Sequence, residues 1–267
     1  MINIRVAVCG ALGKMGQEVV KTVLADPGLE LAGVADINGQ GRTLHAATAG
    51  GIQSDLVIYS DLKTLLAEQK PDACVDFTHP SAVLQNALDM LATGCRPIIG
   101  TTGLSEANLA TLKTETDKRK LACLVAPNFA LGAVLMMKFA QEASKYLDHA
   151  EIIEMHHNQK ADAPSGTAIK TAALMAEARS QFGTTNAPEH ETIEGARGGN
   201  GPADIRIHSV RLPGYVAHQE VIFGGKGQIL TLRHDSIDRT SFMPGVAMAC
   251  KKIVGLTGFI YGLEHLL

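Results

Sequence analysis

Residues 4–16 read Ile-Arg-Val-Ala-Val-Cys-Gly-Ala-Leu-Gly-Lys-Met-Gly, and this stretch decides the fold. The apolar run Ile4–Val8 predicts a buried strand, and Lys14–Leu24 has the residue spacing of an amphipathic helix. The three glycines fall at the junction between the two elements. Glycines at a strand-to-helix junction allow a tight turn and a close approach of the backbone to a ligand, whereas isolated glycines also form ordinary turns.

A second strand followed by an acidic residue continues this pattern. The apolar run Leu29–Ala35 predicts the strand, and Asp36 follows it directly. In dinucleotide-binding folds an acidic residue about 20 residues beyond the glycines binds the ribose hydroxyls, although Asp also commonly serves as a turn or cap residue. The order of strand, glycines, helix, strand and acid favours a dinucleotide site with phosphate at the helix N-terminus.

Short apolar runs and helical patterns alternate through the rest of the first half. Further strands are expected at Leu56–Tyr59, Ala73–Phe77, Pro97–Ile99 and Leu121–Ala126. Helices are expected at Leu62–Gln69, Ala82–Thr93 and Glu106–Lys118. This alternation is typical of an α/β fold, a Rossmann-type doubly wound parallel sheet with helices on both faces.

The pattern changes after Pro127. Helices are expected at Leu131–Leu147 and Thr167–Arg179, and strands at Glu151–His156, Asp204–Arg211, Ala217–Phe223 and Gln228–Arg233. A glycine-rich loop covers Glu194–Pro202, and residues 224–227 are expected to form a hairpin turn. Consecutive strands without intervening helices predict a C-terminal α+β domain built on a mixed or antiparallel sheet. The helical pattern Ser241–Leu256 could pack back on the first domain, which gives domains of 1–128 plus 240–267 and of 129–239.

Composition excludes several classes of partner. The net charge is −3 and aromatic residues make up 4%, so neither a general basic field nor many base-stacking platforms are present for nucleic acid. No apolar run approaches the roughly 20 residues needed to span a bilayer. The five cysteines are scattered without a CxxC pair, which favours neither a disulfide framework nor a zinc ribbon. We expect no nucleic-acid or membrane partner, and a cytoplasmic protein, or one of the plastid stroma if a transit peptide has been removed.

The segment with the most chemical potential is 151–168, Glu-Ile-Ile-Glu-Met-His-His-Asn-Gln-Lys-Ala-Asp-Ala-Pro-Ser-Gly-Thr-Ala. The Pro-Ser-Gly-Thr run is typical of a helix start, whose N–H groups form a carboxylate site. His156, His157 and Lys160 add positive charge and proton donors. Adjacent strand residues point to opposite faces, so both histidines can face one ligand only if the strand ends there. Neighbouring histidines without a nearby cysteine lack the usual spacing of zinc ligands, and no metal site is expected.

Two more loops follow predicted strands and suit the same nucleotide crevice. These are Gly100-Thr101-Thr102-Gly103 and Ala126-Pro127-Asn128-Phe129. Ligands of open α/β sheets bind at the carboxyl ends of the strands, although either loop alone could be an ordinary turn. For Asp76-Phe77-Thr78, a structural role is favoured.

The sequence resembles a known family at this point. The segment Glu154–Ala168 looks like the signature of the 4-hydroxy-tetrahydrodipicolinate reductases (dihydrodipicolinate reductases) of lysine synthesis. The glycine loop with Met15, Asp76-Phe77-Thr78, Gly100-Thr101-Thr102 and Asn128-Phe129 are similar to the other marks of that family, in the same order. The resemblance therefore spans most of the chain.

The resemblance implies an NAD(P)H-dependent reduction of 4-hydroxy-tetrahydrodipicolinate to tetrahydrodipicolinate, with loss of water, in the diaminopimelate route to lysine. It also implies a homotetramer whose C-terminal domains associate through their sheets. His156 would donate or accept a proton, and Lys160 would donate one. The implied carboxylate-binding residues are His157, Lys160, Ser165, Gly166 and Thr167. The implied cofactor contacts are Gly10, Ala11, Leu12, Gly13, Lys14, Met15, Asp36, Gly100, Thr101, Thr102, Ala126, Pro127, Asn128 and Phe129.

The choice between NADH and NADPH stays open in the sequence. Asp36 would repel the 2′-phosphate of NADPH, whereas Lys14 and Arg42 lie close enough in sequence to offset its charge. Some members of the family carry Arg just after the ribose-binding acid, where this chain has Ile37. Two rival interpretations are another two-domain nicotinamide reductase, such as an aspartate or homoserine dehydrogenase-like enzyme, and a nucleotide-binding sensor without catalysis. Neither rival gives a reason for the segment around His156 and Lys160.

Overall fold

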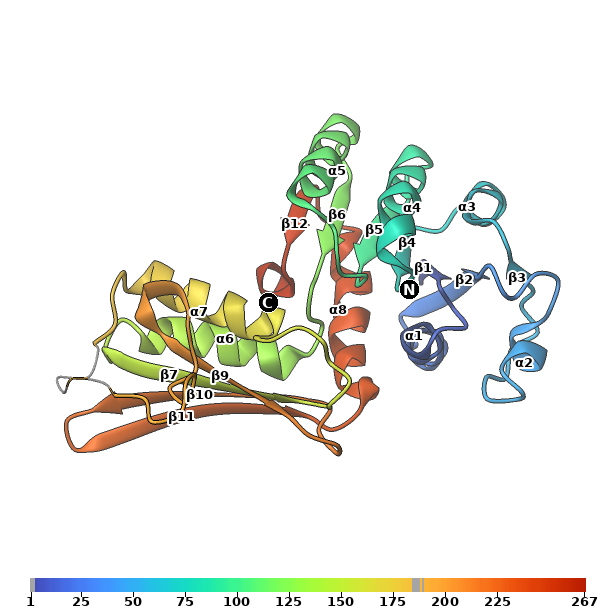
Figure 1. Cartoon of the computed structure of the whole chain (residues 1–267). Helices are drawn as coiled ribbons and strands as arrows, with labels where there is room; N and C mark the ends of the chain where they lie inside the picture. Colours follow the sequence, from blue (N-terminus) through green and yellow to red (C-terminus); the bar gives the residue numbers. More distant parts are fainter. Residues whose placement is uncertain (1–2, 184–187, 189) are drawn as a thin grey trace. The chain divides into compact units, whose positions relative to one another are not determined.

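Figure 1 shows a computed structural model, which describes residues 3–183, 188 and 190–267. The chain divides into two compact units. Unit 1 consists of Met1–Phe129 and Phe242–Leu267, and unit 2 of Ala130–Ser241. Within the described part of the chain, no helix is both long and apolar enough to cross a membrane.

Unit 1 is built on a parallel sheet of seven strands among the residues described. The strands are β1 (Ile4–Cys9), β2 (Leu29–Ala35), β3 (Ile58–Tyr59), β4 (Ala73–Asp76), β5 (Arg96–Ile99), β6 (Ala122–Val125) and β12 (Gly258–Tyr261). Their order is β12-β6-β5-β4-β1-β2-β3, with every neighbouring pair parallel. Strands β1 to β6 therefore have the 3-2-1-4-5-6 order of dinucleotide-binding sheets, which confirms the predicted Rossmann-type architecture.

Helices cover both faces of this sheet. The helices of unit 1 are α1 (Lys14–Ala25), α2 (Leu44–Ala47), α3 (Leu62–Gln69), α4 (Pro80–Ala92), α5 (Glu106–Arg119) and α8 (Met243–Ile253). Helices α1 and α8 lie on one side of the sheet, and α4 and α5 on the other (Figure 1). The side chains of Val6, Ala7 and Val8 are all fully buried, so β1 is covered on both faces. This is why its sequence is continuously apolar.

Unit 2 is built on a mixed sheet. Its strands are β7 (His149–His156), β8 (Gly199–Asn200), β9 (Arg206–Arg211), β10 (Ala217–Gly225) and β11 (Gln228–Ser236), in the order β11-β10-β7-β9-β8. Strand β7 pairs antiparallel with β10 and parallel with β9. The mixed sheet confirms the predicted α+β organisation. The hairpin turn between β10 and β11 is also confirmed, but it is narrower than 224–227, because Gly225 already pairs with Gln228.

Two helices of unit 2, α6 (Leu131–Ala143) and α7 (Gly166–Ala178), cover one face of the mixed sheet (Figure 1). Ile152 of β7 lies between Ile207 of β9 and Val221 of β10, and all three side chains are buried in the core beneath these helices. Side chains alternate along a strand, so Glu154 and His156 lie on the same, helix-covered face as Ile152. The apolar core of unit 2 thus ends in polar residues at the carboxyl end of β7.

Candidate active site

The loop between β1 and α1 requires glycine at two positions. Gly10 has a positive φ of 79°, and a Cβ at this position would lie 2.5 Å from the carbonyl oxygen of Phe77. A Cβ on Gly16 would lie 2.0 Å from the carbonyl oxygen of Gly10. Both neighbours are backbone atoms that cannot rotate away. The glycines therefore shape a bare-backbone loop, as the approach of a pyrophosphate requires.

The N-terminus of α1 offers the hydrogen-bond donors that this loop lacks. Gly10 N and Ala11 N both donate to Ala35 O, at 2.9 and 3.2 Å, and are used within the protein. The N-cap residue Gly13 makes no side-chain cap, and the first N–H groups of a helix have no partner within it. The first turn, which begins at Lys14 and Met15, is thus suited to bind phosphate through backbone N–H groups.

Asp36 braces the glycine loop and also lines a cavity. Its Oδ2 accepts a hydrogen bond from Leu12 N at 3.0 Å, and its Oδ1 accepts one from Asn38 N at 3.0 Å. A carboxylate has about four acceptor positions, so two remain for ribose hydroxyls. The turn function and the ribose function, weighed as alternatives for Asp36, are therefore compatible.

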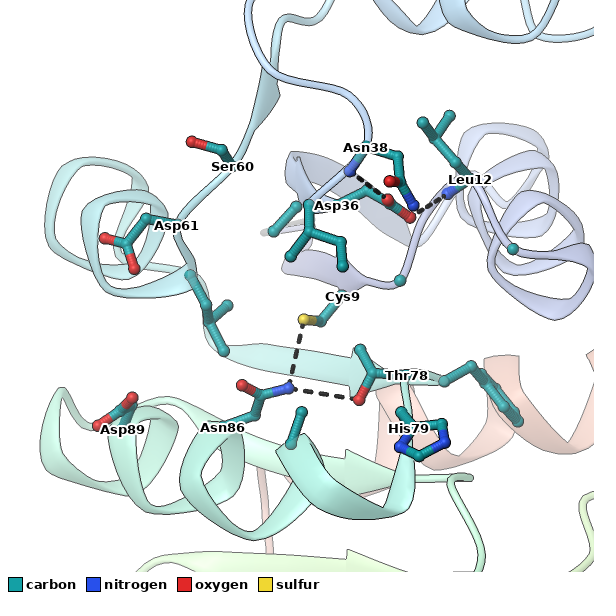
Figure 2. Close-up of a pocket in the computed structure, with 17 residues that line it drawn as sticks. Cys9, Leu12, Asp36, Asn38, Ser60, Asp61, Thr78, His79, Asn86 and Asp89 are labelled. Carbon is teal, nitrogen blue, oxygen red and sulfur yellow. Dashed lines mark hydrogen bonds between the residues drawn. The ribbon is translucent and has the colours of Figure 1, made fainter.

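The cavity has a volume of about 500 Å³, within the range of small-molecule sites. Figure 2 shows Asp36 and Asn38 on one side of it and Thr78, His79 and Asn86 on the other. Of the residues expected to contact a cofactor, Gly10, Leu12, Gly13 and Asp36 line this cavity. The remaining expected contacts, which do not line it, are Ala11, Lys14, Met15, Gly100, Thr101, Thr102, Ala126, Pro127, Asn128 and Phe129.

The remaining cofactor loops lie at the ends of β5 and β6. Gly100 packs against the ring of Phe77, because a Cβ on Gly100 would lie 2.1 Å from that ring. The ring of Phe129 lies on Phe77 as well, with centroids 5.8 Å apart. Phe77 therefore brings the loops that follow β4, β5 and β6 together at the carboxyl edge of the sheet.

Buried Asp76 holds two of these loops in place. It accepts hydrogen bonds from Thr101 Oγ1 at 2.7 Å, from Thr78 N at 3.0 Å and from Asn86 Nδ2 at 2.8 Å. The structural role favoured for Asp76 agrees with these contacts. Its neighbours Phe77 and Thr78 nevertheless line the cavity, although the sequence analysis favoured a structural role for them too. Their position at the end of a parallel strand is the signal that could have found them.

The charges around the cavity are mainly negative. Asp36, Asp61 and Asp89 line it, and His79 is the ionisable base among the described residues that do so. Lys14 and Arg42 do not line the cavity, and the Arg42 guanidinium donates instead to Ala46 O at 3.1 Å. Neither cation is therefore among the residues that line the cavity beside Asp36.

In unit 2, β7 ends at His156, and His157 follows as an exposed residue outside the strand. The strand thus ends where the sequence analysis required it to end if both histidines are to face one ligand. His156 Nδ1 lies 2.5 Å from Glu154 Oε2, two residues earlier on the same face. Lys160 Nζ donates to both carboxylate oxygens of Asp162, at 2.7 and 2.8 Å.

Buried Glu154 and half-buried Arg211 form an ion pair that the sequence analysis did not assign. Arg211 Nη2 donates to Glu154 Oε1 at 2.7 Å, and Nη1 donates to Oε2 at 2.8 Å. Burial acts to raise the pKa of Glu154, but hydrogen bonds from Arg211, Ser209 and His156 outweigh it and lower the pKa. Glu154 is therefore ionised at neutral pH. Its place in the motif was visible in the sequence, but its partner, 57 residues away, was not.

His156 has a lowered pKa. Burial is the largest cause, the positive charges of Lys160 and Arg211 act in the same direction, and the carboxylate of Glu154 opposes them. The imidazole is thus neutral in the free protein over most of the physiological pH range, and a bound anion would raise its proton affinity.

Helix α7 begins beside these residues. Ser165 is its N-cap, with Oγ accepting from Ala168 N at 3.2 Å, and its own N–H donates to Glu154 Oε1 at 3.1 Å. Gly166, the first helical residue, is exposed, and a Cβ there would meet no atom within 4 Å. Thr167 follows it as a half-buried residue. The structure therefore gathers His156, Lys160 and the open N-terminus of α7 at one end of unit 2. Among the residues it describes, no group of three or more His, Cys, Asp or Glu side chains is placed to hold a metal ion.

Known proteins resemble this chain along its whole length. The family described as "Dihydrodipicolinate reductase, N-terminus" matches residues 4–129, and the one described as "Dihydrodipicolinate reductase, C-terminus" matches residues 132–267. The 4-hydroxy-tetrahydrodipicolinate reductase of Lysinibacillus sphaericus is 49% identical over 100% of both chains. That of Listeria innocua is 51% identical over 98% of this chain and 99% of its own.

A solved structure agrees with these relatives. The dipicolinate-bound dihydrodipicolinate reductase from Paenisporosarcina sp. TG-14 superposes with a TM-score of 0.88 at 46% identity, and the match covers 100% of both chains. The fold, the glycine loop and the matches over both halves lead to one conclusion: this chain belongs to the dihydrodipicolinate reductase family.

Proposed function

We propose that the chain reduces 4-hydroxy-tetrahydrodipicolinate to tetrahydrodipicolinate, with loss of water, in the diaminopimelate route to lysine. The observation that carries the proposal is the gathering of His156, Lys160 and the open N-terminus of α7 in unit 2. A histidine, an ammonium group and a helix N-terminus suit a small substrate with two carboxylates. The relative from Paenisporosarcina is bound to dipicolinate, a compound of this class.

Each residue of this cluster has a distinct task in the proposal. The backbone N–H groups of Gly166 and Thr167, the hydroxyl of Ser165 and the side chain of His157 bind carboxylates. Lys160 stabilises negative charge that develops on the substrate and can supply a proton. His156 exchanges a proton with the substrate, which suits a ring that is neutral in the free protein and whose proton affinity a bound anion raises.

Membership of the family implies a nicotinamide cofactor. When bound, it supplies a hydride to the substrate. In the proposal, the glycine loop and the first turn of α1 hold the pyrophosphate, and Asp36 binds the ribose. Gly100–Thr102 and Ala126–Phe129 hold the other half of the dinucleotide, at the carboxyl edge of the sheet.

We further propose that NADH is bound more tightly than NADPH. Asp36, Asp61 and Asp89 line the cavity, and Ile37 offers no charge to a 2′-phosphate. The experiment mixes the purified chain with the product of dihydrodipicolinate synthase and either cofactor, and follows loss of the reduced-nicotinamide absorbance. Oxidation of the cofactor supports the function, and a higher kcat/KM with NADH supports the preference. No oxidation with this substrate, but oxidation with an aspartate-semialdehyde-type substrate, would overturn the proposal.

Replacing His156 or Lys160 tests the chemical assignment. We expect His156→Ala and Lys160→Ala each to lower kcat by roughly 10²-fold or more, the scale of general acid–base catalysis. Affinity for NADH, measured by fluorescence titration, should stay within about twofold, because both residues belong to unit 2. Unchanged kcat in both variants would remove the assignment.

Ile37→Arg tests the cofactor preference. Ile37 is 86% exposed, so the substitution costs little stability and places a guanidinium beside Asp36. We expect kcat/KM with NADPH to rise about tenfold, because Arg pairs well with a phosphate. Ile193→Arg, at another exposed isoleucine, adds the same charge in unit 2 and should leave the NADPH/NADH ratio unchanged. An equal response in both variants would contradict the proposed site of the 2′-phosphate.

We also propose a homotetramer, and a reducing compartment such as the cytoplasm. The sheet face of unit 2 opposite α6 and α7 carries Ile222 and the 76% exposed Ile229, which support association through this face. The five cysteines are free and buried, which suits a reducing compartment. Light scattering should give a mass of four chains, and Ile222→Glu should lower it. A monomeric parent chain would exclude the assembly.

A further inference from the structure

The carboxylate of Glu154 bonds His156, Arg211 and the start of α7 in the proposed chemical site of unit 2. Its side chain is fully buried, and each of its oxygens accepts at least two hydrogen bonds, with a further one from Ser209 to the carboxylate. Oε1 accepts from Arg211 Nη2 at 2.7 Å and from Ser165 N at 3.1 Å. Oε2 accepts from Arg211 Nη1 at 2.8 Å and bonds His156 Nδ1 at 2.5 Å. All acceptor positions are thus occupied, and none is left for a substrate.

This arrangement dictates which nitrogen of His156 carries the hydrogen. An ionised carboxylate can only accept hydrogen bonds, so Nδ1 of His156 must be the donor. In the neutral ring Nε2 is then the unprotonated nitrogen, and it is the one that can take up or release a proton. We propose that Glu154, held ionised by Arg211, is a positioning residue that fixes His156 in the Nδ1–H tautomer. This inference rests on the proposed function of His156 as the group that exchanges a proton with the substrate.

The same ion pair also positions the other two components of the site. Arg211 Nη2 donates to Asp162 O at 2.7 Å, and the side chain of Asp162 holds Lys160 at 2.7 Å. Ser165 N, bound by Glu154, starts helix α7. Residues from β7, β9, the Lys160 loop and α7 are therefore fixed by one carboxylate and one guanidinium.

The charges that face His156 determine how it responds to loss of Glu154. They are Glu154 on its own strand, Arg211 on β9 and Lys160 on the following loop, while the neighbour on β10 is the uncharged Ala217. Glu154 is the group that opposes the pKa-lowering effects of burial, Lys160 and Arg211. Without its negative charge, two cations remain, and the pKa of His156 should fall further.

Glu154→Gln is the direct test. Ser165 N can only donate, so the oxygen of the new amide must face it. The amide NH₂ group then faces His156 Nδ1, which must accept a hydrogen bond. The ring hydrogen of neutral His156 therefore has to lie on Nε2. The tautomer is read without substrate from the ¹⁵N chemical shifts of a histidine-labelled protein. The signal of His156 is the one that disappears in His156→Ala. We expect Nδ1–H in the parent chain, Nε2–H in the variant and a lower pKa of His156 in the variant.

Kinetics give a second readout that a purely structural role would not change in this way. We expect kcat to fall about 10–100-fold, the usual scale for residues that orient a reacting group, with KM for NADH unchanged. The pH at which His156 loses its proton, read from the kcat/KM profile, should move down together with its pKa. A uniform loss of active protein would lower kcat but leave the profile in place.

Glu151→Gln is the matched control. Glu151 lies on the opposite face of β7, and its carboxylate bonds Arg197 Nη2 at 2.6 Å and His208 Nε2 at 2.7 Å. The substitution removes the same charge from a similar ion pair on the same strand. Light scattering shows whether Glu151→Gln has the same mass in solution as the parent chain. We expect the His156 signal, its pKa and kcat to stay at the parent values.

Glu154→Gln leaves half-buried Arg211 without its counter-ion, which can destabilise the fold. The double variant E154Q/R211M removes both charges and keeps the amide beside His156. It therefore tests the tautomer of His156 if the single variant does not fold. An Nδ1–H tautomer and an unchanged pH profile in the double variant would overturn the proposal. Because the tautomer is measured on the protein alone, this outcome is separate from failure of the parent chain to reduce the substrate, which would overturn the proposed function.

Discussion

Asp36 and Glu154 are two carboxylates near strand ends. The hydrogen bonds that each accepts determine whether it can bind a ligand. Asp36 accepts two backbone N–H groups and lines a cavity, so half of its acceptor positions are available to a ligand. Glu154 accepts at least four hydrogen bonds within the protein and is fully buried. The first is thus suited to bind, and the second to orient residues that bind.

Gly166, the first residue of α7, allows a test of carboxylate binding at this helix start. A Cβ there meets no atom within 4 Å, and Ala is the better helix former by roughly 0.5–1 kcal/mol, so Gly166→Ala should leave stability equal or slightly higher. If a carboxylate binds at this helix start, the methyl group stands in its approach. We expect KM for the substrate to rise about tenfold, measured by steady-state kinetics, with KM for NADH unchanged.

Gly255→Ala is the control for this substitution. Its Cβ would lie 3.8 Å from Lys252 O, an ordinary contact, and the residue belongs to unit 1. Both Michaelis constants should stay at the parent values. A Gly166→Ala enzyme with unchanged KM for the substrate would show that the carboxylate binds elsewhere.

At the scale of elements, a buried hydrogen bond attaches α7 to the sheet of unit 2. Gln219 Nε2 on β10 donates to Thr171 Oγ1 at 2.7 Å, and both side chains are buried. Thr171→Val keeps the shape of the side chain but leaves the amide unsatisfied. We expect the free energy of unfolding, measured in urea, to fall by about 1–3 kcal/mol.

Thr111→Val on α5 is the matched control. Thr111 and Thr171 both donate to the carbonyl oxygen four residues earlier, at 2.9 and 2.8 Å, but Thr111 is exposed and accepts no buried amide. Its loss should change stability by less than about 0.5 kcal/mol. Equal effects in the two variants would mean that the bond to Gln219 contributes nothing.

Elements with strong periodicity could be predicted from the sequence, and weakly patterned ones could not. Strand Leu29–Ala35 and helix Leu62–Gln69 have the predicted bounds. A continuous apolar run determines the strand, and apolar residues at helical spacing determine the helix. Strand β12 was missed, since a four-residue edge strand carries little pattern. Helix α6 ends at Ala143 rather than at Leu147, because Lys145 N and Tyr146 N bond carbonyls three residues back and tighten the last turn.

Some residues of the candidate site could be predicted from the sequence, and others could not. Glycines and histidines of continuous motifs were visible, because the chemistry depends on neighbours in sequence. Arg211 was not visible, because it reaches Glu154 only through the parallel pairing of β7 and β9. Phe77 was assigned a structural role, although its position after a predicted strand was a signal that it could line the cavity.

At the scale of the molecule, unit 2 is inserted between two adjacent points of unit 1. The chain leaves unit 1 after Phe129 and returns at Phe242. Within unit 1 these points lie close together, since a Cβ on Gly245 would lie 2.0 Å from Phe129 O. Inside unit 2 the first and last elements are also neighbours, since a Cβ on Gly132 would lie 2.5 Å from the ring of His234. Each unit can thus close on itself.

A fragment of residues 130–241 should therefore fold alone. All members of its main hydrophobic core come from within this range, so the core does not depend on side chains of unit 1. We expect circular dichroism of a mixed α/β protein and one cooperative unfolding transition in urea. Phe223→Ala, at a fully buried ring, should remove about 3–5 kcal/mol, whereas Ile237→Ala, 81% exposed, should change little. A fragment without a cooperative transition, or one equally sensitive at both positions, would show that unit 2 needs unit 1 in order to fold.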